Sequence, residues 1–142
     1  MIRKTALAAA LVCATPLLAD DAAPHVTVVT SGDAQTQLMS MVLTGQAMAK
    51  GHPTRVLLCG PGGDLALKEA PEAATAPQPP KGASPQGLLK MMLDNGATVE
   101  VCAIYLPGKG AGPEVLMDGV SVAAPPAMAD ALLAEDGTVW SF

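Results

Sequence analysis

Two cysteines are the residues of this sequence best suited to chemistry. Cys59 directly follows the apolar run "TRVLL" and Cys102 follows "TVEV", and each precedes a segment that contains glycine and proline. A reachable thiolate can form a disulfide, carry a sulfur atom or bind a soft metal ion. A cysteine can also be buried as a small apolar side chain. For Cys102 all of these interpretations are open, and Cys59 is a possible second thiol.

The other polar residues do not predict a conventional catalytic site. His25 and His52 precede the first two predicted strands, whereas the cysteines follow strands, so the two residue types are expected at opposite ends of a parallel sheet. The segment "GPGGD", residues 60–64, lacks the Gly-Lys-Ser/Thr ending of a phosphate-binding loop and is interpreted as a turn. The sequence therefore predicts no cofactor and argues against a hydrolase or a nucleotide-dependent enzyme.

A soft-metal site is a further alternative. Two thiols and several methionines could hold an ion such as Cu(I), but their spacing matches no established ligand motif, so no metal ligand is assigned. The methionines stand in predicted helices, where this side chain most often fills core space: Met39, Met41, Met48, Met91 and Met92.

Residues 1–19 have the layout of a secretory signal peptide. Arg3 and Lys4 precede a short apolar run, and the small residue Ala19 precedes an acidic start. We expect cleavage there and a periplasmic protein of residues 20–142. No later segment approaches 18 uninterrupted apolar residues, so no membrane span is predicted.

Removal of this segment changes the charge and the cysteine count. Arg3 and Lys4 leave while all thirteen Asp and Glu remain, so the formal charge changes from −5 to −7. An acidic exported protein is a poor candidate for binding nucleic acid. Cys13 also leaves, and the ordinary expectation for the remaining pair in an oxidising compartment is a disulfide.

Strands and helices are expected to alternate along the mature chain. The strand signals are the runs "HVTVV", "TRVLL", "TVEVCAIYL", "VSVAA" and "TVWSF". The predicted helices are residues 34–51 after an Asp33 cap, a helix opened by Ser84 and Pro85, and "PPAMADALLAEDG". The apolar faces expected on the first two of these helices include Leu38, Val42, Leu88, Met91 and Met92. Residues 71–83 form a Pro/Ala-rich loop. This alternation predicts an α/β fold with a mainly parallel sheet and helices on both faces.

The order of these segments resembles the DsrE/DsrF-like family, which includes the YchN-like proteins. The resemblance rests on "HVTVVTSGD", "RVLLCG", "GATVEVCAIYLPGKG" and "DGVSVAAPPAMADALLAEDGTVWSF", and it covers nearly all of the mature chain. It implies a flavodoxin-like sheet of about five strands and assembly into homo-oligomers, as trimers or hexamers. In the sulfur-relay members a cysteine at the position of Cys102 carries sulfur as a persulfide.

Two functional hypotheses follow. The first is a periplasmic sulfur-handling protein, a persulfide carrier or a thiol-redox protein acting through Cys102 with a sulfur-donor or acceptor protein. The alternative is an oligomeric binding or scaffold protein, with or without a soft metal, that has no catalytic thiol. Gly108, Gly110 and Gly112 predict a pliable loop after Cys102, in which Lys109 is either solvated or folded over the sulfur.

A flavodoxin-like strand order 2-1-3 would place the first strand between those that carry the cysteines. Two strand spacings amount to about 9.6 Å. A disulfide requires Cα atoms within about 7 Å, so this order predicts two free thiols and no intrachain bond between Cys59 and Cys102.

Overall fold

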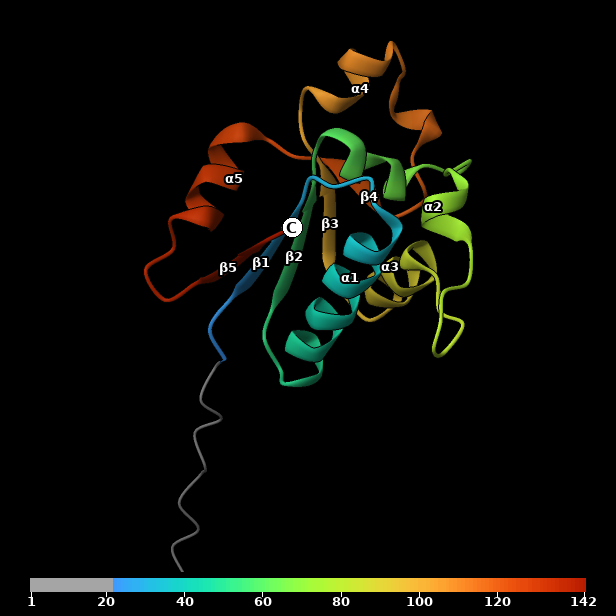
Figure 1. Cartoon of the computed structure of the whole chain (residues 1–142). Coiled ribbons are helices and arrows are strands. Elements are labelled where there is room, and N and C mark those ends of the chain that lie inside the picture. The colour runs from blue at the N-terminus through green and yellow to red at the C-terminus, as the bar shows by residue number, and fades with distance from the viewer. Residues whose placement is uncertain (1–21) are drawn as a thin grey trace, which may run out of the picture.

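A computed structural model of the protein describes residues 22–142, in which five parallel strands form one sheet with helices on both faces (Figure 1). The predicted signal peptide lies outside the described residues. The strands are β1 (His25–Val29), β2 (Thr54–Leu58), β3 (Thr98–Val101), β4 (Val120–Val122) and β5 (Thr138–Ser141). The helices are α1 (Ala34–Ala49), α2 (Glu72–Thr75), α3 (Pro85–Asp94), α4 (Tyr105–Lys109) and α5 (Pro125–Leu132), with 3-10 helices η1 (Gly60–Ala66) and η2 (Pro113–Val115).

The order of the strands in the sheet is β4-β3-β2-β1-β5. The predicted α/β architecture is therefore confirmed, but the order 2-1-3 for the first three strands is wrong, because β2 pairs with both β1 and β3. The first three strands follow one another in the same direction across the sheet, from β1 through β2 to β3. Right-handed crossovers in one direction put their helices on one face, which is where α1 and α3 lie.

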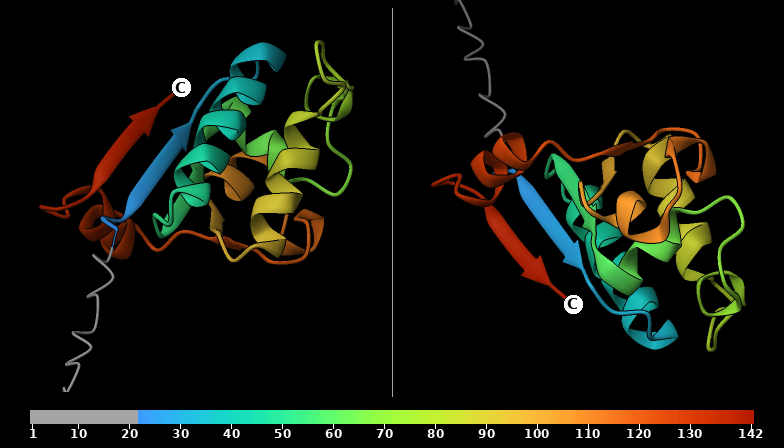
Figure 2. Two further views of the ribbon diagram at one scale, coloured as in Figure 1. Left: turned by 90° about the horizontal axis from the view of Figure 1, so that it is seen from below. Right: turned by 90° about the horizontal axis from the view of Figure 1, so that it is seen from above.

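The last crossover runs in the opposite direction, from the β4 edge to the β5 edge. The same handedness then requires its helix to lie on the other face. Figure 2 shows α5 on the side of the sheet opposite to α1 and α3, with β5 beside β1. The winding of the chain thus explains why helices cover both faces.

The predicted starts of α1 and α3 are confirmed by their caps. The Asp33 carboxylate accepts a hydrogen bond from the Thr36 backbone N–H at 2.9 Å, and the Ser84 hydroxyl accepts one from the Gly87 N–H at 3.1 Å. These bonds satisfy donors that lack an intrahelical partner. Pro85 occupies the first turn of α3, where its missing N–H is not needed.

The Pro/Ala-rich segment 71–83 is more ordered than a plain loop. It contains the helical turn α2, whose Ala74 is fully buried. The Gln78 side-chain amide donates to the Ala34 carbonyl at 2.8 Å, which ties the segment to the start of α1. Its packing against α1 and α3 therefore makes it part of the helical layer.

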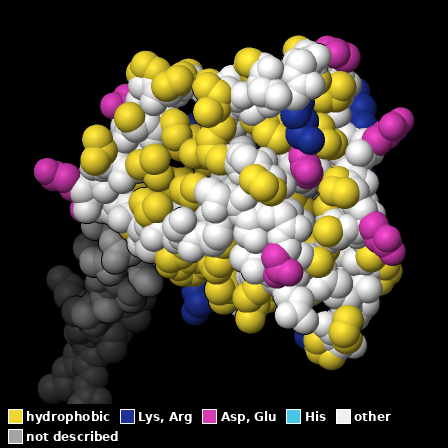
Figure 3. Space-filling view, turned by 45° about the horizontal axis from the view of Figure 1, so that its top comes forward, with side chains coloured by type: hydrophobic (Ala, Val, Ile, Leu, Met, Phe, Trp, Pro, Cys, Tyr) yellow, Lys and Arg dark blue, Asp and Glu magenta, His cyan; other side chains and the backbone are white. Residues whose placement is uncertain are grey.

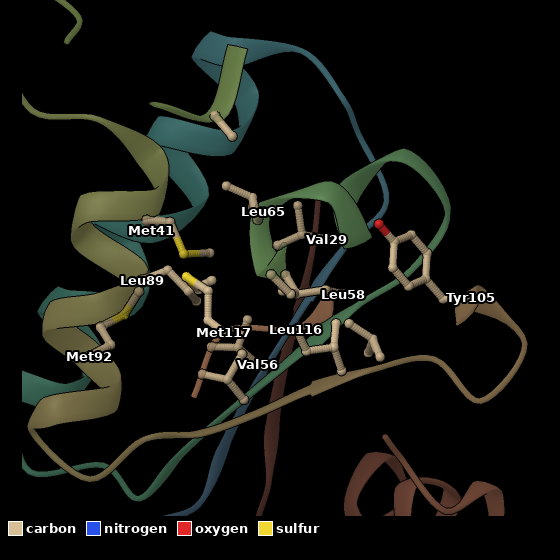
Figure 4. Close-up of a cluster of buried hydrophobic side chains, with 14 of the residues drawn as sticks. Val29, Met41, Val56, Leu58, Leu65, Leu89, Met92, Tyr105, Leu116 and Met117 are labelled. Atoms are coloured by element: carbon tan, nitrogen blue, oxygen red, sulfur yellow. The ribbon is translucent and has the colours of Figure 1, made fainter. Parts of the chain in front are cut away.

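The main hydrophobic core lies between the sheet and the α1/α3 layer. Figure 4 shows Met41, Leu89 and Met92 facing Val56 and Leu58 of β2. A second, smaller cluster lies under α5 and consists of Leu57, Ala123 and Met128. Within residues 22–142 no helix is long and apolar enough to cross a membrane.

Candidate functional site

Cys59 and Cys102 are joined by a disulfide at the carboxyl edge of the sheet. The β2/β3 register pairs Leu58 with Val101, so the next residues along both strands are the two cysteines. The Cys102 backbone N–H donates to the Leu58 carbonyl at 2.9 Å, which continues the ladder to this point. The Cα atoms lie 5.1 Å apart, close to the spacing of neighbouring strands and within reach of a disulfide.

The prediction of two unpaired thiols is therefore wrong. Its error lies in the strand order, because the argument about separation is sound for cysteines on strands that are not neighbours. Once β2 and β3 are adjacent, their register pairs the last residue of each strand, so the cysteines that directly follow lie face to face.

The disulfide lies on the α5 face of the sheet. Side chains alternate along a strand, and Val101 points into the α1/α3 core, so Cys102 points to the other face. Both cysteines are partly buried and pack against the small cluster of Leu57 and Met128. The carboxylate of Glu100, which shares this face, forms an ion pair with Arg55 at 2.7 Å. The sulfur pair is thus apolar on its inner side and only partly covered.

Each cysteine is followed by a short helical segment. The Gly62 N–H donates to the Cys59 carbonyl at 3.0 Å, and the Tyr105 N–H donates to the Cys102 carbonyl at 2.9 Å. The predicted pliable loop after Cys102 and the predicted turn after Cys59 are therefore wrong in detail, since they form α4 and η1. Gly110 ends α4 with φ at 64°, in the left-handed region that favours glycine over other residues.

Asp64, Tyr105 and Lys109 connect these two segments. The Tyr105 hydroxyl donates to Asp64 Oδ1 at 2.7 Å, and the Lys109 ammonium pairs with the same oxygen at 2.7 Å. Figure 4 shows the Tyr105 hydroxyl turned toward η1. Lys109 Nζ also lies 5.4 Å from the centre of the Tyr105 ring. The prediction that left Lys109 either solvated or over the sulfur missed this pairing.

The electrostatics of this cluster keep the tyrosine neutral. Burial raises the pKa of Tyr105, and the hydrogen bond to Asp64 and its negative charge raise it further. Gly63 lies directly against the ring, because a Cβ at that position would overlap Tyr105. Two features of the sequence belong to this contact, Gly63 beside Asp64 and the single tyrosine, Tyr105. Neither feature predicts from the sequence alone that the two residues meet.

The histidines lie at the opposite end of the sheet, as predicted. The Thr44 hydroxyl donates to the Ser40 carbonyl at 2.6 Å, so it must accept from Thr27, which lies 2.7 Å away. The Thr27 hydroxyl then accepts from His25 Nε2 at 2.8 Å, which fixes a proton on that nitrogen. Burial lowers the pKa of His25, and the nearby His52 lowers it further.

The structure offers little for a metal ion. Within residues 22–142 no three His, Cys, Asp or Glu side chains lie close enough together to hold one. Met41 and Met92 are core residues, whereas Met39 and Met91 are exposed on the helical layer.

Figure 3 shows apolar side chains gathered toward α5 on the face that includes the carboxyl edge of the sheet.

Comparisons with known proteins identify the fold. No protein-family model and no curated protein matches the sequence. Among solved structures, a protein of unknown function, MTH1491 from Methanobacterium thermoautotrophicum, is similar with a TM-score of 0.67 and 14% identity. The ychN protein from E. coli is similar with a TM-score of 0.61 and 19% identity. Each comparison covers 84% of this chain and 99% of the other. The DsrE/YchN-like fold implied by the sequence is confirmed.

Proposed function

We propose that this protein is an exported sulfur-handling protein whose Cys59–Cys102 pair cycles between a disulfide and a dithiol. The observation that carries the proposal is the position of the pair. The disulfide lies at the carboxyl edge of a parallel sheet, where ligands and chemistry collect in such folds, and it is partly exposed.

Reduction by a partner dithiol proceeds in two exchanges. A partner thiolate attacks the Cys102 sulfur, a mixed disulfide forms, and Cys59 leaves as a thiolate that takes up a proton. The second partner thiol then attacks the partner sulfur of the mixed disulfide and releases Cys102. Two electrons and two protons pass to the pair, and the partner becomes a disulfide.

The same pair can accept sulfur from hydrosulfide. The hydrosulfide ion attacks the Cys102 sulfur, the Cys59–Cys102 bond breaks, and Cys59 leaves as a thiolate. Cys102 then carries a persulfide, and the disulfide itself has served as the oxidant. An acceptor thiolate that removes the outer sulfur leaves a dithiol, which a partner disulfide reoxidises.

The role of Cys102 as the more reactive, sulfur-carrying thiol is tested with single cysteine variants. Cys59→Ser leaves Cys102 as the free thiol, and Cys102→Ser leaves Cys59 as the matched control. We expect faster alkylation and faster exchange with an aromatic disulfide when Cys102 is free. Faster labelling of Cys59 would assign the carrier role to that residue, and inertness of both would favour the binding or scaffold alternative.

We also propose that the mature protein is periplasmic and associates with itself. The signal-peptide pattern of residues 1–19 supports export. Exposed apolar side chains on α1, including Met39 at 53% exposed, and Val139 at 43% on the edge strand β5 support association, since such groups often mark interfaces. Fractionation with intact mass tests cleavage near Ala19, and light scattering at micromolar concentration tests for trimers or hexamers; a monomer would contradict the assembly.

A further inference from the structure

We infer that Asp64, Tyr105 and Lys109 form a clamp that keeps Cys59 and Cys102 facing each other after their disulfide is reduced. The inference rests on the proposed function in one respect, because it concerns the dithiol state of the pair. The three residues are positioning residues, since none of them is part of the sulfur exchange.

The clamp joins the two segments that carry the sulfurs. Asp64 lies in η1, which begins directly after Cys59. Tyr105 is the first residue of α4, and its backbone N–H donates to the Cys102 carbonyl. The side-chain contact between Asp64 and Tyr105 therefore spans the same two chain segments as the disulfide. When the covalent link opens, this contact remains between them.

Several features make the contact stronger than an ordinary surface pair. Tyr105 is only 6% exposed, and its ring packs on Gly63, where a side chain would displace it. Its hydroxyl donates to an ionised carboxylate, which gives a shorter and stronger hydrogen bond than a neutral acceptor. Lys109 balances the carboxylate charge from the same helix as the tyrosine. Two different interactions therefore connect α4 to Asp64.

The clamp should raise the effective concentration of one thiol near the other. A thiol pair that is held together forms its disulfide more readily, so its reduction potential is more negative. We expect Tyr105→Phe to lower the effective concentration about tenfold, which corresponds to a potential about 30 mV less negative. Asp64→Asn keeps an acceptor for the tyrosine but removes the ion pair, so its shift should be smaller.

The test is equilibration of the folded protein with glutathione redox buffers, followed by acid quenching and thiol counting. Tyr105→Phe is compared with the wild-type protein and with Ser84→Ala, which removes the cap of α3 on the sheet face opposite to the disulfide and should destabilise both redox states alike. A less negative potential for Tyr105→Phe and an unchanged one for Ser84→Ala support the clamp. Equal potentials for Tyr105→Phe and wild type would overturn it.

A second pair of variants covers poor folding of Tyr105→Phe. Asp64→Asn and Lys109→Gln change partly exposed side chains, and both should shift the potential in the same direction. The effective concentration is measurable whether or not the pair exchanges sulfur with a partner. Failure of the alkylation and exchange tests would therefore count against the proposed function, whereas an unchanged potential in these variants would count against the clamp.

Discussion

Breaking the Cys59–Cys102 bond should lower the free energy of unfolding of a protein of residues 20–142 by about 4 kcal/mol. The two cysteines are separated by 43 residues in the sequence. The chain-entropy relation for a cross-link of this span gives about 13 cal/mol/K, or about 4 kcal/mol at about 25 °C, through restriction of the unfolded chain. The disulfide joins neighbouring strands of the sheet, so its loss leaves the ladder that holds β2 to β3 in place.

The assay is urea denaturation of the wild-type protein and of the double variant Cys59→Ser/Cys102→Ser, with reduced wild type as the control for the serine side chains. The double variant should also show a larger denaturant slope, because its unfolded chain is more expanded. A difference in unfolding free energy below about 1 kcal/mol, with reduced wild type agreeing, would refute the loop-entropy argument for this bond.

The same free energy fixes a redox quantity. A two-electron couple gains about 1.4 kcal/mol for each 30 mV or so, so about 4 kcal/mol places the reduction potential of the folded pair about 85 mV below that of the unfolded chain. Glutathione titration of Cys59 and Cys102 with and without urea measures the difference. Equal potentials in the two states would show that the fold does not favour the bond.

Three further predictions concern the scaffold. Ser84→Ala should cost about 1 kcal/mol of unfolding free energy in urea, because the first turn of α3 loses its cap. Gly62→Ala should lower the free energy of unfolding by about 1–3 kcal/mol, since a Cβ would overlap the Val29 carbonyl. Gly45→Ala, which has open space around it within α1, should raise the free energy of unfolding by about 0.5–1 kcal/mol. A Gly62→Ala protein more stable than Gly45→Ala would contradict this packing. The pKa of His25 is lowered below 6.5 in the folded protein, so the unfolded state binds the proton first and the free energy of unfolding falls as pH drops below 6.5. His25→Gln should reduce the difference in unfolding free energy between pH 7 and pH 5. A difference equal to that of the wild type would exclude this residue as its source.

The architecture was predictable because its signals are local. Asp33, Ser84 and Pro85 mark helix starts through contacts within one turn, and alternation of strands with helices dictates a parallel sheet. The strand order is not local. The sequence does not state the direction of each crossover, and the choice between the orders 2-1-3 and 1-2-3 decided whether Cys59 could reach Cys102.

The buried face of α1 shows a second limit. The expected apolar stripe included Leu38 and Val42, but Val42 is exposed while Gln37, Ser40 and Thr44 are buried. Ser40 and Thr44 are buried with hydrogen-bond partners, which include the chain from Thr44 through Thr27 to His25. The Gln37 side-chain amide donates to the Ser31 carbonyl, while its Oε1 is buried without a partner among the described residues. Periodicity of apolar residues does not reveal such partners on other elements.

The clamp was missed for a related reason. Asp64 and Tyr105 belong to different helical segments, η1 and α4, and 41 positions separate them in the sequence. Each residue has an ordinary local interpretation, a turn aspartate and a lone aromatic residue. Their meeting follows from the adjacency of β2 and β3, which brings together the segments after Cys59 and Cys102.

The most direct test of sulfur handling is the mass of the oxidised protein of residues 20–142 after exposure to sulfide. The sample is quenched with acid, alkylated and digested, so that Cys59 and Cys102 are read separately. The proposed chemistry predicts the gain of one H₂S, with a persulfide on Cys102 and a free thiol on Cys59. A persulfide on Cys59 with a free thiol on Cys102 would contradict it. So would a disulfide that stays intact at about a thousandfold the sulfide concentration that opens the bond in the urea-unfolded chain, which is the excess that a potential about 85 mV lower requires.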